Sequence, residues 1–430
     1  ALAVGLLCMA LAGYLALLGW AWGRWRTAVW WRDAVLFAGL WLLAELARAL
    51  IFTGFPWGAS GYGLVDSPLR HLAPWLGVYG MGAIWALLCA CAVWGFVAGG
   101  SGWRRGAAVL WIPLAVWALD AAGTRPFTHP QGAPLKVALL QSNVAQDEKF
   151  QADYQLPMLL WHARALLSTP GDLVVAPETA IPLLPSQLPE GYWRQLQQGV
   201  AQAGRDALVG VPLGDFNAGY TNSVAGFSPE ALRLPDGQYR YDKHHLVPFG
   251  EFIPFGFHWF VRMMNMPLGD FSRGPLAAPS FPVHEQRVAP TICYEDLFGE
   301  EIASRFADPA SAPTILANVS NLAWFGERVA IYQHQQIARV RSLEFQLPTI
   351  RATNTGATMA IDQAGQVTAS LAPNTRGVLQ AQVQGMTGVT PFAWWAARWG
   401  LWPLVLLGVF MVLFSGRVVQ RGAETTPAVE

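Results

Sequence analysis

The segment Thr291-Ile292-Cys293-Tyr294-Glu295-Asp296 closes a β-type run that begins at Arg287. An apolar strand therefore delivers a thiol at its end, with acidic residues directly behind it. A single cysteine is by default a small buried hydrophobe. The polar neighbours of Cys293 argue against full burial, so the segment predicts a strand exit that presents Cys293.

Two other segments have comparable features. Val174-Val175-Ala176-Pro177-Glu178 is an apolar strand that ends in a carboxylate, and the loop Tyr241 to Glu251 contains Lys243 beside a turn with Pro and Gly. Each by itself would be read as an ordinary loop or helix cap. Together with Cys293 they indicate a catalytic site, because a nucleophilic thiol needs a base for its proton and a cation beside the thiolate.

Strand-like and helix-like segments alternate between about Arg125 and Thr390. The β-type runs are Lys136 to Leu140, Asp172 to Ala176, Ala207 to Val211, Arg287 to Ile292, Thr314 to Val319, Thr349 to Ala352 and Val378 to Val383. The helix-like stretches are Gln151 to Leu167, Tyr192 to Ala203 and Arg328 to Phe345. This alternation predicts an α/β domain rather than an all-β one.

The composition indicates a membrane protein. Of 430 residues, 53% are hydrophobic and 13% are charged, about half the charged fraction of roughly 25% typical of soluble domains. Five apolar stretches are candidates to cross the roughly 30 Å hydrocarbon layer. They are Ala1 to Gly23, Ala34 to Thr53, Leu72 to Gly100, Gly106 to Leu119 (short unless it extends to Gly123) and Trp399 to Gly416.

The first stretch lacks the basic leader of a secretory signal peptide, so a spanning helix is preferred. Because the chain starts inside this stretch and without Met, we expect upstream residues to be missing. Glu45 and Arg48 lie three residues apart in the second stretch, on one helix face, where a structural ion pair is expected rather than catalysis.

Short-loop arginines indicate the orientation. The arginines that follow the first, third and last stretches lie on one side of the membrane, and the positive-inside rule predicts that this side is cytoplasmic. They are Arg24, Arg26, Arg32, Arg104, Arg105, Arg417 and Arg421. The large α/β segment falls on the opposite, extracytoplasmic side. Lys plus Arg equals Asp plus Glu at 28 each, so no net field draws the chain to nucleic acid.

Four cysteines are present, and Cys8, Cys89 and Cys91 lie in apolar stretches. The α/β segment has one cysteine, which excludes a disulfide framework there, and no metal-binding spacing is present. We therefore expect no metal and no cofactor.

The order Glu178, Lys243, Cys293 resembles the Glu-Lys-Cys triad of the nitrilase (carbon–nitrogen hydrolase) superfamily. Further matches cover residues about 135 to 385; they are Asn318-Val319-Ser320-Asn321, Ala323-Trp324-Phe325-Gly326, His334 and Arg351-Ala352-Thr353-Asn354-Thr355-Gly356. The resemblance implies a nitrilase-like four-layer αββα sandwich. In one departure from the family, Leu322 stands where Asp is usual.

A nitrilase-like domain between membrane spans resembles the apolipoprotein N-acyltransferase family, as do Phe52-Thr53-Gly54-Phe55-Pro56-Trp57 and Leu246 to Glu251. The resemblance implies catalytic Glu178, Lys243 and Cys293. It also implies support from Glu251, Tyr294 and Glu295.

The same resemblance implies the substrates and the place of action. A phospholipid would donate an acyl group to Cys293 as a thioester, and the N-terminal amine of a diacylglyceryl-cysteine lipoprotein would accept it. The implied location is the bacterial inner membrane, with the catalytic domain in the periplasm and the chain acting as a monomer. The expected division is 1–123 for about four helices, 124–390 for the catalytic domain, 391–416 for a last helix and 417–430 for a cytoplasmic tail.

Apolar residues after the lysine loop are expected to form a lid or acyl groove, or simply domain core; they are Phe249, Phe252, Ile253, Phe255, Phe257, Trp259 and Phe260. Two other functions stay open. The same triad would serve a membrane-tethered amidase or nitrilase that passes the acyl group to water, and a polytopic transport or scaffold protein could carry an inactive domain. The presence of all three triad residue types argues against the second.

Overall fold

The computed structural model describes residues 2–27, 29–97, 102–123, 125–149, 151–215, 217–253, 271–326 and 328–416. It divides into two compact units, Ala1–Arg125 with Arg398–Glu430, and Pro126–Ala397. The expected tail 417–430 and the lid residues Phe255, Phe257, Trp259 and Phe260 lie outside the described residues.

The first unit is helical. Its long helices are α1 (Leu2–Trp25), α2 (Trp30–Leu50), α3 (Ala73–Val97) and α4 (Gly102–Ala122), with 3-10 turns η1 (Ile51–Thr53), η2 (Ser60–Leu64) and η3 (Pro68–Leu72). Helix α2 packs against α1, α3 and α11 (Trp402–Ser415). Glu45 on α2 is buried, accepts the Ser60 N–H at 2.7 Å and lies 3.9 Å from Arg48, an arrangement that suits a structural pair.

Three helical stretches of the described chain are long and apolar enough to cross a membrane: Val4–Trp25, Trp30–Thr53 and Pro68–Trp94. A shorter apolar helix covers Ile112–Ala122. The expected last helix is instead two, α10 (Pro391–Trp399) and α11, bent by 93°. Gly400 between them has φ +54°, the left-handed conformation that commonly ends a helix. The number of spans stays a prediction.

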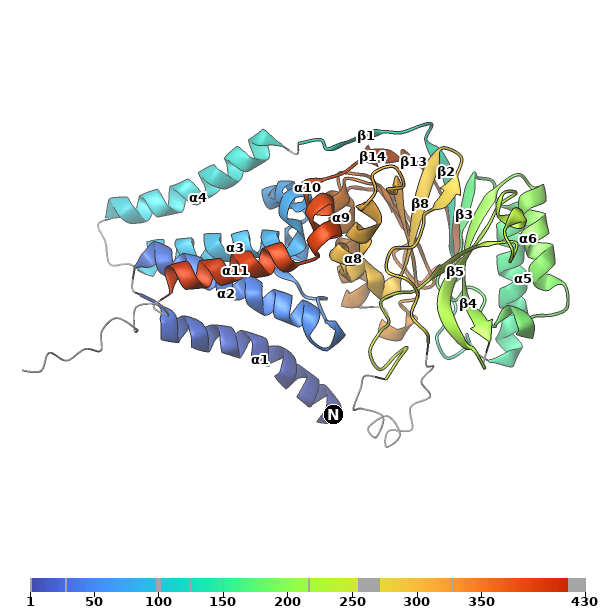
Figure 1. Cartoon of the computed structure of the whole chain (residues 1–430), viewed down its shortest axis with the longest axis horizontal. Helices are drawn as coiled ribbons and strands as arrows, with labels where there is room; N and C mark the ends of the chain where they lie inside the picture. The colour runs from blue at the N-terminus through green and yellow to red at the C-terminus, as the bar shows by residue number, and fades with distance from the viewer. Residues whose placement is uncertain are drawn as a thin grey trace, which may run out of the picture. The chain divides into compact units, whose positions relative to one another are not determined.

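The second unit contains two mixed six-stranded sheets (Figure 1). The first has the order β13-β2-β3-β4-β5-β6, with strands Gly377–Val383, Leu135–Gln141, Leu173–Val175, Asp206–Asp215, Gly219–Phe227 and Tyr239–Asp242. The second has the order β12-β11-β10-β9-β8-β7, with strands Val367–Ser370, Met359–Ile361, Thr349–Thr353, Ile315–Ser320, Gln286–Ile292 and Phe281–Val283. Strands β2-β3-β4 and β8-β9-β10 run parallel. A small ribbon pairs β1 (Thr128–Pro130) with β14 (Met386–Gly388).

Alternating apolar side chains join the sheets into layers. Residues such as Val137, Val175, Ile292 and Val319 form the core between the two sheets, because successive strand residues point to opposite faces. On the outer face of the first sheet lie α5 (Ala152–Ser168) and α6 (Tyr192–Gln202). Helices α8 (Gly299–Ala303), α9 (Val329–Phe345) and α10 cover the second sheet (Figure 1). The predicted αββα sandwich is confirmed.

Candidate active site

The predicted triad residues follow the carboxyl ends of three strands. Glu178 follows β3, Lys243 follows β6, and Cys293 follows β8 as the first residue of the 3-10 turn η6 (Cys293–Leu297). Rigid strands end here beside solvent, which is where α/β folds commonly hold reacting groups. The fold therefore brings together residues that are 65 and 50 positions apart in the chain.

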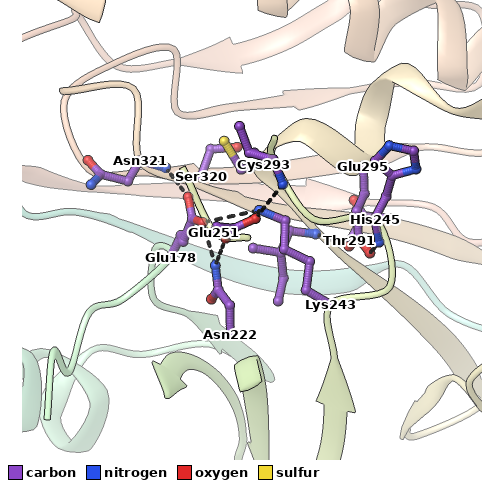
Figure 2. Close-up of polar contacts among 12 residues, drawn as sticks. Glu178, Asn222, Lys243, His245, Glu251, Thr291, Cys293, Glu295, Ser320 and Asn321 are labelled. Atoms are coloured by element: carbon purple, nitrogen blue, oxygen red, sulfur yellow. Dashed lines mark hydrogen bonds and ion pairs between the residues drawn. The ribbon is translucent and has the colours of Figure 1, made fainter. Parts of the chain in front are cut away.

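Lys243 lies between two carboxylates. Its Nζ is 2.8 Å from Glu251 Oε2 and 3.7 Å from Glu178 Oε1, and the side chain is buried. Burial alone would lower the pKa of Lys243, but the carboxylates of Glu251 and Glu178 raise it above its usual value. The ammonium is therefore a fixed positive charge beside the thiol (Figure 2).

Neutral donors hold the two carboxylates in place. Asn222 on β5 donates through Nδ2 to Glu178 Oε1 at 2.8 Å and to Glu251 Oε1 at 2.7 Å. The backbone N–H of Asn321 donates to Glu178 Oε2 at 2.8 Å, and that of Val247 donates to Glu251 Oε2 at 2.9 Å. Figure 2 shows Asn222 and Asn321 approaching Glu178 from different sides. Sequence reasoning did not assign Asn222 a role.

The Cys293 thiol is uncharged at rest. Burial and the nearby Glu178 carboxylate raise the pKa of the thiol well above its usual value, while Lys243 and the Asn321 N–H act in the opposite direction. A neutral thiol is a weak nucleophile. Attack therefore requires that its proton pass to a base, and Glu178 is an adjacent carboxylate.

Polar groups beneath Cys293 hold its backbone in an uncommon conformation. The residue has φ +52°, in the left-handed region that residues other than glycine rarely adopt. Asn318 Nδ2 donates to the Thr291 hydroxyl at 3.0 Å and to the Cys293 carbonyl at 3.4 Å, and Thr291 donates to Asp296 at 3.1 Å. These bonds fix the sharp turn that leaves Cys293 partly exposed.

Glu295 ties two loops together. Its carboxylate accepts the Ile292 N–H at 2.7 Å, the Tyr241 hydroxyl at 2.7 Å and the His244 N–H at 2.7 Å, so it joins the cysteine turn to the lysine segment. Tyr294 is buried and packs edge-on against Phe298 at 5.3 Å between ring centroids. These two predicted supporting residues thus lie next to Cys293 as parts of its frame.

Leu322 is fully buried in a small apolar cluster against which Cys293 also packs. The residue that departs from the family pattern therefore contributes to packing near the thiol. Among the described residues, no group of three or more His, Cys, Asp or Glu side chains is placed to hold a metal ion.

Comparison with known proteins finds two family models that match the chain. Residues 136–392 match the family model for carbon-nitrogen hydrolases, and residues 1–92 match the N-terminal domain of apolipoprotein N-acyltransferases. The fold and site thus define a carbon–nitrogen hydrolase domain joined to an apolar helical domain.

Two curated relatives refine this class. The chain is 50% identical to apolipoprotein N-acyltransferase of Verminephrobacter eiseniae, covering 86% of this chain and 71% of that protein. It is 46% identical to the apolipoprotein N-acyltransferase of Ralstonia nicotianae, covering 96% and 77%. The chain therefore belongs to the apolipoprotein N-acyltransferase family, and it is an acyltransferase. Among solved structures, an amidase from Nesterenkonia sp. matches with 13% identity and a TM-score of 0.43, covering 59% of this chain and 92% of that one.

Proposed function

We propose that this enzyme moves a fatty acyl group from a membrane phospholipid to the N-terminal amine of diacylglyceryl-cysteine lipoproteins, with Cys293 as the carrier. The observation that supports this most directly is the network of Glu178, Lys243 and Glu251 beside the Cys293 thiol. It supplies a base, a cation and a means of keeping that cation charged. A base for the thiol proton and a cation beside the thiolate both favour attack of a thiol on an ester.

In the first half-reaction, Glu178 takes the proton of Cys293 while Sγ attacks the ester carbonyl. Lys243 stabilises the oxyanion, an interaction worth roughly 3 kcal/mol for each well-placed donor. The carbonyl re-forms, the bond to the lysophospholipid oxygen breaks, and that oxygen takes the proton from Glu178. A thioester on Cys293 and a free lysophospholipid remain.

In the second half-reaction, the α-amine of the acceptor attacks the thioester carbonyl and gives a proton to Glu178. The carbon–sulfur bond breaks, and the departing sulfur recovers that proton. The product is an amide on the lipoprotein. Glu251, bonded to both Lys243 and Asn222, keeps the cation in place throughout.

Both substrates carry acyl chains, and moving such a chain into water costs about 0.8 kcal/mol per methylene. Membrane-spanning helices in the same chain keep the active site near these substrates. We place the enzyme in the bacterial inner membrane, with several spans, a periplasmic catalytic domain and one copy as the working unit. The arginine distribution supports this orientation. A reporter fused within residues 126–390 that is active only in the cytoplasm would contradict it.

Intact-mass measurement after incubation with phospholipid tests the carrier role. We expect one added acyl mass on Cys293, with release of about one equivalent of lysophospholipid as a burst. A diacylglyceryl peptide with a free α-amine should then discharge the adduct, and its N-acetylated counterpart should not. Continuous release of fatty acid without acceptor would instead indicate a hydrolase.

A further inference from the structure

Lysine is rare in this chain, which has three lysines and 25 arginines. Lys136 is exposed on β2, whereas Lys149 and Lys243 are both buried beside Glu178. Arginine stays charged in every setting, while lysine carries a compact ammonium that a buried site can adjust. The two cations at Glu178 are thus of the rarer type.

Lys149 binds the backbone of Glu178, the residue whose side chain we propose as the general base. It ends the turn that follows β2, is 2% exposed, and donates through Nζ to the Glu178 carbonyl oxygen at 3.0 Å. The same turn contacts Asn321, because Gln146 Oε1 accepts from Asn321 Nδ2 at 2.8 Å. Since the Asn321 N–H in turn binds the Glu178 carboxylate, this turn fixes Glu178 from two directions.

The buried positive charge of Lys149 also needs a physical explanation. Within the described residues, no carboxylate lies within 4.0 Å of its ammonium. Burial lowers the pKa of Lys149 to about 8, while Glu178 and Cys293 act to raise it. A buried ammonium without an ion pair is costly, so its retention beside the thiol calls for a compensating benefit.

Charge balance supplies that benefit. Glu178 and Glu251 bring two negative charges, and Lys243 balances one of them. With Lys149 the centre is neutral before Cys293 loses its proton. Without Lys149 it would already carry a net negative charge, which would oppose formation of the thiolate and of the oxyanion.

We infer that Lys149 is a positioning residue of the acyl-transfer site, which fixes Glu178 through its carbonyl and supplies the second positive charge that allows Cys293 to react. The inference rests on the proposed roles of Glu178 and Cys293. It adds a fourth charged group to the predicted triad and Glu251.

The test is the pH dependence of Cys293 alkylation by iodoacetamide in the full-length protein in detergent, followed by peptide mass spectrometry. For Lys149→Met we expect alkylation about tenfold slower than in the wild type at pH 7, where Lys149 is charged, but nearly equal above pH 9, where Lys149 has lost its charge. Acyl-enzyme formation at pH 7 should slow roughly 100-fold. Lys149→Arg should be alkylated at close to the wild-type rate at pH 7, because it restores the charge. Lys136→Met removes the exposed lysine and should change neither measurement.

The other titratable groups that interact with Lys149 are the same in all variants. They are Glu178 and Cys293, which act to raise its pKa, and His162, whose own pKa burial lowers to about 3 so that it stays neutral. Alkylation of a folded Lys149→Met protein at the wild-type rate at pH 7, or slowed by the same factor at pH 7 and pH 9, would overturn the inference, since slowing that does not depend on pH fits a structural role. If that variant does not fold, Lys149→Gln replaces it, and slow alkylation of a folded Lys149→Arg protein at pH 7 would also overturn the inference.

Alkylation requires no lipid, so it reports on the thiol whatever the acyl donor and acceptor are. Failure of the proposed function would appear elsewhere, as retained transfer by Cys293→Ala. The two ideas can therefore fail separately.

Discussion

The two ends of the first sheet bear carboxylates in opposite settings. At the carboxyl ends of its strands, Glu178 receives N–H donors from Asn222 and Asn321, and Lys243 lies 3.7 Å away. At the opposite end, Asp206 begins β4; it is 8% exposed, and no group in the described part of the chain donates a hydrogen bond to its carboxylate. Burial raises the pKa of Asp206 to about 7. This domain thus surrounds a buried carboxylate with donors and a cation at the end of the first sheet that lies beside Cys293, which follows β8 of the second sheet.

The largest effect is expected at the thiol itself. Cys293→Ala should abolish acyl transfer and the mass adduct, because it removes the nucleophile and little volume. Unfolding temperature and membrane insertion should be unchanged. Cys8→Ala, at an exposed cysteine in α1, is the control and should transfer normally. Substantial transfer by the Cys293 variant would rule out the thioester mechanism. The Glu178 end of the sheet would then have no catalytic role that distinguishes it from the Asp206 end.

The next effect concerns the groups that act on the thiol. Glu178→Gln preserves size and acceptor oxygen but deletes the base, and Lys243→Met deletes the cation. Each should lower the rate of acyl-enzyme formation about 1,000-fold or more, since residues that act as one unit fail together. Single-turnover release of lysophospholipid measures this rate. Near-normal release by either variant would show that the triad is misassigned.

A smaller loss of activity but a larger loss of stability is expected at Glu295. Its carboxylate receives N–H and hydroxyl donors and contacts no group that we expect to react. Glu295→Gln should destabilise the protein by about 2 kcal/mol, because an amide nitrogen would face donors that now bind an oxygen. Thermal unfolding and single-turnover release, measured together, separate this role from catalysis. Loss of transfer without loss of stability would assign Glu295 to the chemistry instead.

Much of the fold follows from patterns within single segments. Short segments rich in apolar residues predict β2, β4 and β8, and helical periodicity predicts α5, α6 and α9. Strands β11 and β12 escape detection because each is short and lies in no longer apolar run, unlike the equally short β3, which lies in the run Leu173 to Pro177. Strand β5 escapes because Thr221, Asn222 and Ser223 interrupt its apolar pattern with polar side chains.

The residues of the site also fall into those that a local sequence pattern predicts and those that it does not. Glu178, Lys243 and Cys293 can be found because each stands where an apolar segment or turn ends, a signal within a few neighbouring residues. Asn222 and Lys149 reach Glu178 across 44 and 29 residues of sequence, and such contacts depend on strand order, which no local pattern encodes. The scarcity of lysine is the signal that could have drawn attention to Lys149.

The smallest effect concerns the end of the sheet away from the site, and two residues of one strand provide matched variants. Asp206 begins β4 and Asp215 ends it. Burial raises the pKa of Asp206 to about 7, with Glu230 and Asp172 adding to the rise and His284 opposing it. Hydrogen bonds from the Ala218 and Asn217 N–H groups lower the pKa of Asp215.

The pKa shifts of Asp206 and Asp215 are opposite in sign, so the two residues affect stability differently as pH rises. Between about pH 4, the usual pKa of Asp in an unfolded chain, and pH 7, the folded protein retains a proton on Asp206 that the unfolded chain has lost. This contribution to stability is therefore present at low pH and disappears as pH rises to 7. Asp206→Asn should leave the unfolding temperature nearly unchanged at pH 4 and raise it at pH 8 by roughly 2 °C, corresponding to about 1 kcal/mol once solvent screening at the sheet edge is allowed for. Asp215→Asn should have no stabilising effect at pH 8, because the lowered pKa makes the ionised form of Asp215 favourable above pH 4. Scanning fluorimetry of both variants at the two pH values is sufficient, and equal shifts in both would show that burial at the start of β4 does not set the protonation of Asp206.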